Sequence, residues 1–76
     1  MSPRLPTLRP REVIRALERA GFYLDHATGS HHYFKHPDRP RILLTVPVHL
    51  RDIKRLVLGA IIKQAGLAPE AFLDLL

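Results

Sequence analysis

The spacing of apolar residues changes twice along the chain, and these changes constrain the fold more than any other feature. From Pro10 onward, Val13, Ile14 and Leu17 recur at helical spacing, which predicts a helix with one buried face. Pro10 suits the first turn, because its missing N–H would be unpaired there in any residue. Gly21 follows where a left-handed residue commonly ends a helix.

After Gly21 the spacing becomes that of β-strands. Three short runs, FYLDHAT, SHHYFKH and RILLTV, are separated by turn sequences at Thr28-Gly29 and at residues 37–40. This pattern predicts a three-stranded antiparallel meander that ends at Pro47.

Helical spacing returns over residues 51–65. Gly66 is a candidate for the end of this helix, and Pro69 opens a short last helix. The apolar stripe predicted for the longer helix contains Ile53, Leu56, Val57, Ala60, Ile61 and Gln64.

This order of elements predicts an α+β fold of the type α-β-β-β-α, with a short extra helix at the C-terminus. Such a sheet buries one face under both helices and leaves the other face open. A chain of 76 residues has room for one small domain. We expect that domain to cover residues 10–76, and residues 1–9 to form a flexible arm.

The chain is basic, with 12 Lys and Arg against 7 Asp and Glu. This excess favours a polyanionic partner, with nucleic acid as the first candidate. The absence of cysteine excludes disulfides and thiolate metal sites, and no apolar run approaches the ~20 residues of a membrane span. We therefore expect a cytoplasmic protein without a membrane partner. Because so small a core gives little stability by itself, we also expect a homodimer or a binding partner.

Strand alternation assigns the histidines of the second strand to two faces. Phe34 is expected to be buried, because it is the largest apolar residue of that strand. His32 and His36 lie an even number of positions away and share its face. A register slip or a bulge near Gly29 would invert this assignment. The residues expected on the open face are His31, Tyr33 and Lys35.

The segment GSHHYFKHP (residues 29–37) contains three of the five histidines. A metal site is not favoured, because His31 and His32 point to opposite faces, and His36 lies roughly 13 Å from His32 at about 3.3 Å per residue. Acid–base catalysis is the alternative, since histidine exchanges a proton near neutral pH and RNA carries its own nucleophile, the 2′-hydroxyl. From composition alone, strand histidines without a chemical role are the simpler interpretation.

Four pieces of the sequence stand out together: EVIRALERAGF (residues 12–22), GSHHYFKHP (29–37), TVP (45–47) and IIKQAGLAPEAFLDLL (61–76). In combination they resemble the HicA family of bacterial toxins, which are small mRNA interferases with a fold similar to double-stranded-RNA-binding domains. The helix piece is common, whereas the Gly-Ser-His strand with the Lys-Gln-Ala-Gly-Leu tail is quite specific. The resemblance implies an endoribonuclease that cleaves mRNA without a metal or other cofactor. It also implies a HicB-like antitoxin partner that covers the active site.

The resemblance further implies that the catalytic residue is the histidine of the Gly-Ser-His motif, here His31. His32 is the alternate, because some members place one residue between the serine and the histidine. The open-face assignment independently favours His31 as the general base. Gly29 would supply the turn before the strand, and Ser30 would bond to the turn or to RNA.

Other residues are expected to contact RNA. A solvated helix face is the simpler interpretation of the arginine stripe, and an RNA-positioning face is the alternative. The expected contacts are Tyr33, which would stack a base, Lys35 at a phosphate, and Arg11 and Arg15, which form the stripe with Arg19.

The longer C-terminal helix departs from the family, which commonly has a small or polar pair and a basic residue where this chain has Leu56, Val57 and Gly59. Leu58 and Ile62 fall outside the predicted stripe. We expect them to pack against the last helix, with a partner or dimer surface as the alternative.

His49 follows the third strand, and we expect it to cap or flank the start of the next helix. A second polar group near the open face is the alternative. Two other function classes stay open: a non-catalytic RNA-binding module of the double-stranded-RNA-binding type, and a pure interaction protein.

Overall fold

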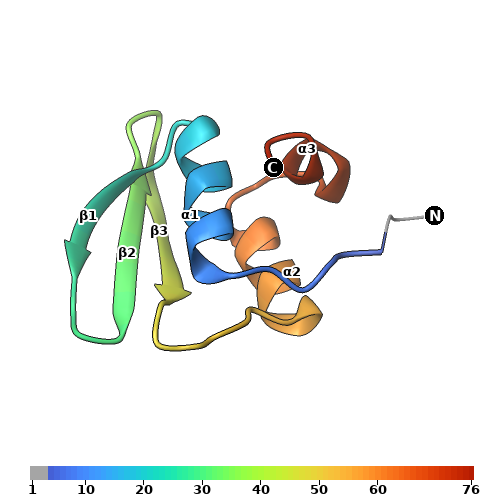
Figure 1. The fold of residues 1–76 in the computed structure, drawn as a ribbon. Helices are drawn as coiled ribbons and strands as arrows, with labels where there is room; N and C mark the ends of the chain where they lie inside the picture. Colours follow the sequence, from blue (N-terminus) through green and yellow to red (C-terminus); the bar gives the residue numbers. More distant parts are fainter. Residues whose placement is uncertain (1–3) are drawn as a thin grey trace.

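Three strands form an antiparallel sheet with helices packed on one side of it (Figure 1). The structure, a computed structural model, describes residues 4–76. Its elements are α1 (Pro10–Arg19), β1 (Tyr23–Ala27), β2 (His31–His36), β3 (Arg39–Pro47), α2 (Arg55–Gln64) and α3 (Pro69–Leu73). The strands lie in the sheet in the order β1-β2-β3. The predicted α+β fold, its α-β-β-β-α order and the short last helix are confirmed.

Both long helices end at a glycine in the left-handed region, as predicted. Gly21 has a φ of 97° and Gly66 a φ of 73°. After α1, the N–H groups of Gly21 and Phe22 donate to carbonyls of the last turn, each at 3.0 Å. The same pair of bonds recurs after α2, from Gly66 and Leu67. These bonds satisfy carbonyls that a helix end otherwise leaves unpaired.

The core lies between the sheet and the helices, and the faces of β2 are those predicted. Phe34 is opposite Leu44, and His32 is opposite Val46. The strand irregularities lie at Leu24/His26 in β1 and beyond Phe34 in β2, so none inverts the start of β2. The buried residues are Leu8, Val13, Ala16, Leu17, Phe22, Phe34, Leu44, Val46, Ile53, Leu58, Ile61, Ile62, Ala65 and Phe72.

The buried face of α2 differs from the predicted stripe. Leu56 is 88% exposed, whereas Leu58, Ile61 and Ile62 are buried. The prediction counted helical turns from Ile53, but Ile53 precedes the helix and lies in extended chain. Counted within the helix, the buried residues follow the usual i, i+3, i+4 spacing. Leu58 and Ile62 therefore belong to the main core, together with Phe72 of α3.

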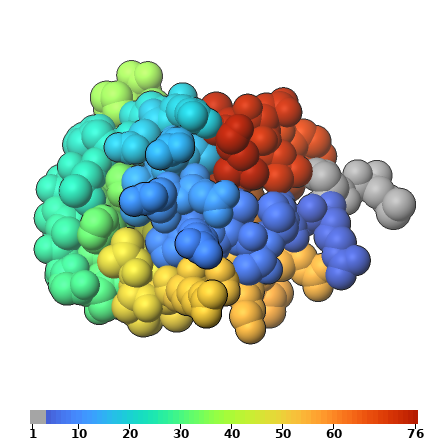
Figure 2. Space-filling model, viewed as in Figure 1, coloured from blue at the N-terminus to red at the C-terminus, as the bar shows by residue number. Residues whose placement is uncertain are grey.

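Part of the predicted flexible arm packs on the domain. The backbone of Leu8 pairs with that of Ile53 through two hydrogen bonds, of 3.1 and 2.6 Å. Leu8 is buried, and Leu5 packs against the core. Figure 2 shows this segment in dark blue against the orange surface of α2. Residues 1–3 of the predicted arm lie outside the described residues.

The turn between β2 and β3 binds the C-terminal ends of both long helices. His36 Nε2 donates to the carbonyl of Ala20 at 3.1 Å, and Arg39 Nη1 donates to the carbonyl of Ala65 at 2.7 Å. Ala20 and Ala65 are the C-cap residues of α1 and α2. One end of the sheet is thus hydrogen-bonded to the C-terminal ends of both long helices.

Candidate active site

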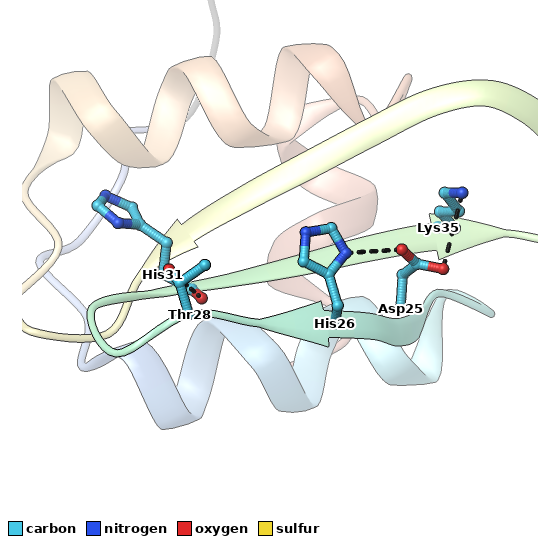
Figure 3. A network of polar contacts seen from close by, with 5 residues as sticks. All are labelled: Asp25, His26, Thr28, His31 and Lys35. Atoms are coloured by element: carbon cyan, nitrogen blue, oxygen red, sulfur yellow. Dashed lines mark hydrogen bonds and ion pairs between the residues drawn. The ribbon is translucent and has the colours of Figure 1, made fainter.

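The turn between β1 and β2 presents His31 at the other end of the sheet. The N–H of Thr28 donates to the carbonyl of His31 at 2.9 Å, which closes the turn around Gly29 and Ser30. Figure 3 shows His31 at the start of β2, beside the end of β3. Its side chain is half-buried and lies on the open face, since its strand position alternates with that of Phe34.

Gly29 lies in this turn as predicted, but the turn does not require a glycine. Its φ is outside the left-handed region, and a Cβ placed on it meets no atom within 4 Å. Packing and backbone geometry therefore leave the identity of the residue free.

Ser30 links two segments that are distant in sequence. Its hydroxyl lies 3.3 Å from Nδ1 of His31. Its carbonyl accepts hydrogen bonds from the N–H of Val48 at 3.0 Å and from Nδ1 of His49 at 3.2 Å. The residues that follow β3 are therefore attached to the turn that precedes β2.

His49 consequently lies beside His31, with ring centroids 5.4 Å apart. The expected capping role is wrong, because α2 begins after Lys54, which is its N-cap residue. The alternative of a second polar group near the open face fits instead. The contact follows from the strand register of the structure: with His31 opposite Pro47, antiparallel pairing continued by two residues brings His49 next to Gly29.

A second polar cluster occupies the open face farther along the sheet (Figure 3). Asp25 accepts a hydrogen bond from Nδ1 of His26 at 2.7 Å and pairs with Lys35 Nζ at 3.6 Å. The hydrogen bond from His26 and the charge of Lys35 hold the pKa of Asp25 below its usual value. The ring of His26 stacks on Tyr33 with centroids 4.3 Å apart, so a base stacking on Tyr33 would have only the other ring face.

The other two histidines of the GSHHYFKHP segment lie away from this surface. His32 is opposite the buried Val46 and points to the helix side of the sheet. His36 uses both ring nitrogens within the fold: Nε2 donates to Ala20, and Nδ1 accepts from the N–H of Asp38 at 3.1 Å. Of the three histidines in this segment, only His31 is presented on the open face.

Within residues 4–76, no three His, Asp or Glu side chains are grouped to hold a metal ion. Comparison with known protein families matches residues 10–67 to a family described as the HicA toxin of bacterial toxin–antitoxin systems. The chain belongs to the HicA toxin family. It is thus a toxin component of such a system, for which an antitoxin partner is implied. No curated protein matches the chain.

The HicA match runs from the first residue of α1 to just past α2, so it contains the whole sheet and the His31–Ser30–His49 cluster. α3 lies beyond it, although Phe72 of that helix is fully buried in the core. Among the described residues, none of the helices has the length and apolarity needed to cross a bilayer.

The arginine stripe of this HicA chain lies apart from His31. Arg11, Arg15 and Arg19 line a pocket with Leu76 on the outer side of α1, whereas His31 is on the sheet face that the helices leave open. Arg19 Nη1 also donates to the carbonyl of Leu75 at 2.6 Å. The expected RNA-contacting residues therefore do not form one continuous site.

The helix that departs from the HicA pattern exposes its unusual residues. Leu56 and Val57 are exposed, whereas Gly59 faces Leu5, which a Cβ there would meet at 3.6 Å. That distance is an ordinary contact, so packing does not demand a glycine at position 59.

Proposed function

We propose that this toxin is a metal-independent endoribonuclease that cleaves mRNA in the bacterial cytoplasm, with His31 as the general base. The observation that supports the proposal most directly is the half-buried ring of His31 on the open sheet face, with its Nδ1 3.3 Å from the Ser30 hydroxyl. In this proposal Ser30 orients the ring: its hydroxyl accepts from Nδ1, and Nε2 is left to take a proton from a 2′-hydroxyl.

The remaining expected contacts then serve to position RNA. Lys35 lies roughly 13 Å from His31 along β2, at about 3.3 Å per residue, and is paired with Asp25. It would contact a neighbouring phosphate and not the one being cleaved. Tyr33 would stack a base through the ring face that His26 leaves free.

The proposed partner is a HicB-like antitoxin that covers the open sheet face around His31. Two large apolar side chains of the open sheet face are about half exposed, at Tyr23 and Leu43, and burial by a partner would stabilise them. A homodimer is the other proposed use of exposed apolar surface. Gel filtration of the chain alone and with the antitoxin distinguishes the two.

The test is cleavage of unstructured mRNA by the wild-type chain and by His31→Gln, each with and without EDTA. Gln keeps a hydrogen-bonding side chain of similar reach but cannot act as a base. We expect cleavage by the wild type in EDTA and none by the variant, while His32→Ala remains active. Intact RNA with a mobility shift would instead indicate the non-catalytic RNA-binding module, and activity of His31→Gln with loss in His32→Ala would move the role to His32.

A further inference from the structure

Two histidines meet at the candidate active site, although the proposed function uses only one. The rings of His31 and His49 have centroids 5.4 Å apart with a 59° angle between their planes. Each ring nitrogen reaches about 3 Å to a hydrogen-bonded oxygen. Two rings at this separation can therefore contact two oxygens of one phosphodiester.

The orientation of His49 is set by the backbone. A carbonyl oxygen only accepts hydrogen bonds, so Nδ1 of His49 carries the hydrogen in its 3.2 Å bond to Ser30. Nε2 is then the nitrogen left for a ligand. The side chain of His49 is exposed, and the N–H of Val48 holds the same carbonyl at 3.0 Å, which fixes the segment. His49 is thus oriented by an acceptor on one nitrogen, an arrangement typical of histidines that transfer protons through the other.

The other candidates for a proton donor are less suitable. Both ring nitrogens of His36 are engaged by Ala20 and Asp38. Lys35 is paired with Asp25 and lies four residues along β2 from His31. His49 is the histidine whose ring lies next to that of His31 and whose second nitrogen is free of the bonds that the fold makes.

We propose that His49 is a second catalytic residue, the general acid that protonates the leaving 5′-oxygen of RNA; this inference rests on the proposed ribonuclease function. His31 takes the proton of the 2′-hydroxyl, and the 2′-oxygen forms a bond to phosphorus. The bond between phosphorus and the 5′-oxygen breaks, and Nε2–H of protonated His49 gives its proton to that oxygen. The products are a 2′,3′-cyclic phosphate and a 5′-hydroxyl, and exchange with water restores both histidines.

The test uses a leaving group that needs no acid. An RNA oligonucleotide cleaved by the wild type is resynthesised with sulfur in place of the bridging 5′-oxygen at the cleaved linkage, because a thiolate leaves without protonation. We expect His49→Ala to cleave the ordinary RNA about 10²- to 10⁴-fold more slowly than the wild type, and the sulfur-containing RNA at close to the wild-type rate. His31→Ala should be slow on both substrates.

His49→Asn separates acid catalysis from positioning. Its amide can still donate to the Ser30 carbonyl, but it cannot transfer a proton. If this variant is as active as the wild type on ordinary RNA, or if His49→Ala is equally slow on both substrates, His49 is not the general acid. Leu56→Ala, which changes an exposed residue of α2, is the control and should retain activity. If the wild type cleaves no RNA, the proposed function fails and the assignment of His49 fails with it; cleavage unaffected by His49→Ala overturns only this inference.

Discussion

Gly21→Ala and Gly29→Ala form a matched pair in which the structure predicts opposite effects on stability. At Gly21 the φ of 97° is in the left-handed region, where a side chain costs about 1–2 kcal/mol. The new Cβ would also lie 2.7 Å from Nε2 of His36. Because His36 is held at both ring nitrogens, its bond to Ala20 must break or shift, at a cost of about 0.5–1.5 kcal/mol.

Alanine also restricts the unfolded chain, which offsets about 0.4–1 kcal/mol of these costs. The net expectation for Gly21→Ala is a loss of about 2 kcal/mol, or roughly 8–16 °C in melting temperature for a domain of this size. Gly29→Ala meets neither strain nor a close atom, so its stability should equal or exceed that of the wild type by up to about 1 kcal/mol.

Urea unfolding followed by circular dichroism measures both variants, and cleavage of mRNA is measured on the same samples. We expect Gly29→Ala to be as stable as the wild type and to retain cleavage, because its methyl group meets no atom of His31 within 4 Å. A loss below about 0.5 kcal/mol in Gly21→Ala, or an equal loss in Gly29→Ala, would contradict the reasoning from backbone angle and His36 contact.

Leu58→Ala should lower the free energy of unfolding, measured in urea, by about 2–5 kcal/mol, because Leu58 is fully buried. Leu56→Ala, on the exposed face of the same helix, should change that free energy by less than about 0.5 kcal/mol. Equal losses would mean that the buried face of α2 is misassigned. The lowered pKa of Asp25 means that its carboxylate stabilises the fold above the ordinary Asp range and that this contribution is lost as pH falls through the lowered value. In Asp25→Asn the melting temperature should therefore fall less steeply at acid pH than in the wild type. The same fall in both proteins would show that the Asp25 carboxylate does not stabilise the fold. The double variant Arg11→Ala/Arg15→Ala should bind RNA more weakly and with a smaller salt dependence, and its cleavage rate at saturating RNA should equal that of the wild type. A lower rate at saturating RNA would mean that the arginine stripe acts in the catalytic step.

The ends of the helices and the faces of β2 could be predicted because they depend on neighbouring residues. Gly21 and Gly66 end helices through bonds that reach back only a few positions, and a glycine at that position is a local signal. The face of His31 follows from its parity with Phe34. No bulge falls between these two residues, so the local rule was sufficient there.

The phase of α2 and the position of His49 could not be predicted in the same way, because both depend on distant chain segments. Ile53 has the spacing of a helical residue, but its backbone pairs with Leu8, and tertiary pairing overrides the local pattern. The bond from His49 to Ser30 spans 19 positions. It follows from the register of β2 and β3, which the alternation of each strand alone does not define.

The attachment of both helix ends to the turn between β2 and β3 has an evolutionary consequence. The bonds from His36 and Arg39 that hold α1 and α2 lie at the opposite end of β2 from His31. Substitutions of His31, the proposed catalytic residue, therefore leave these bonds intact. We expect such an inactive variant to stay folded and to keep binding its antitoxin. A gene that encodes it would supply a protein that competes with active toxin for the antitoxin.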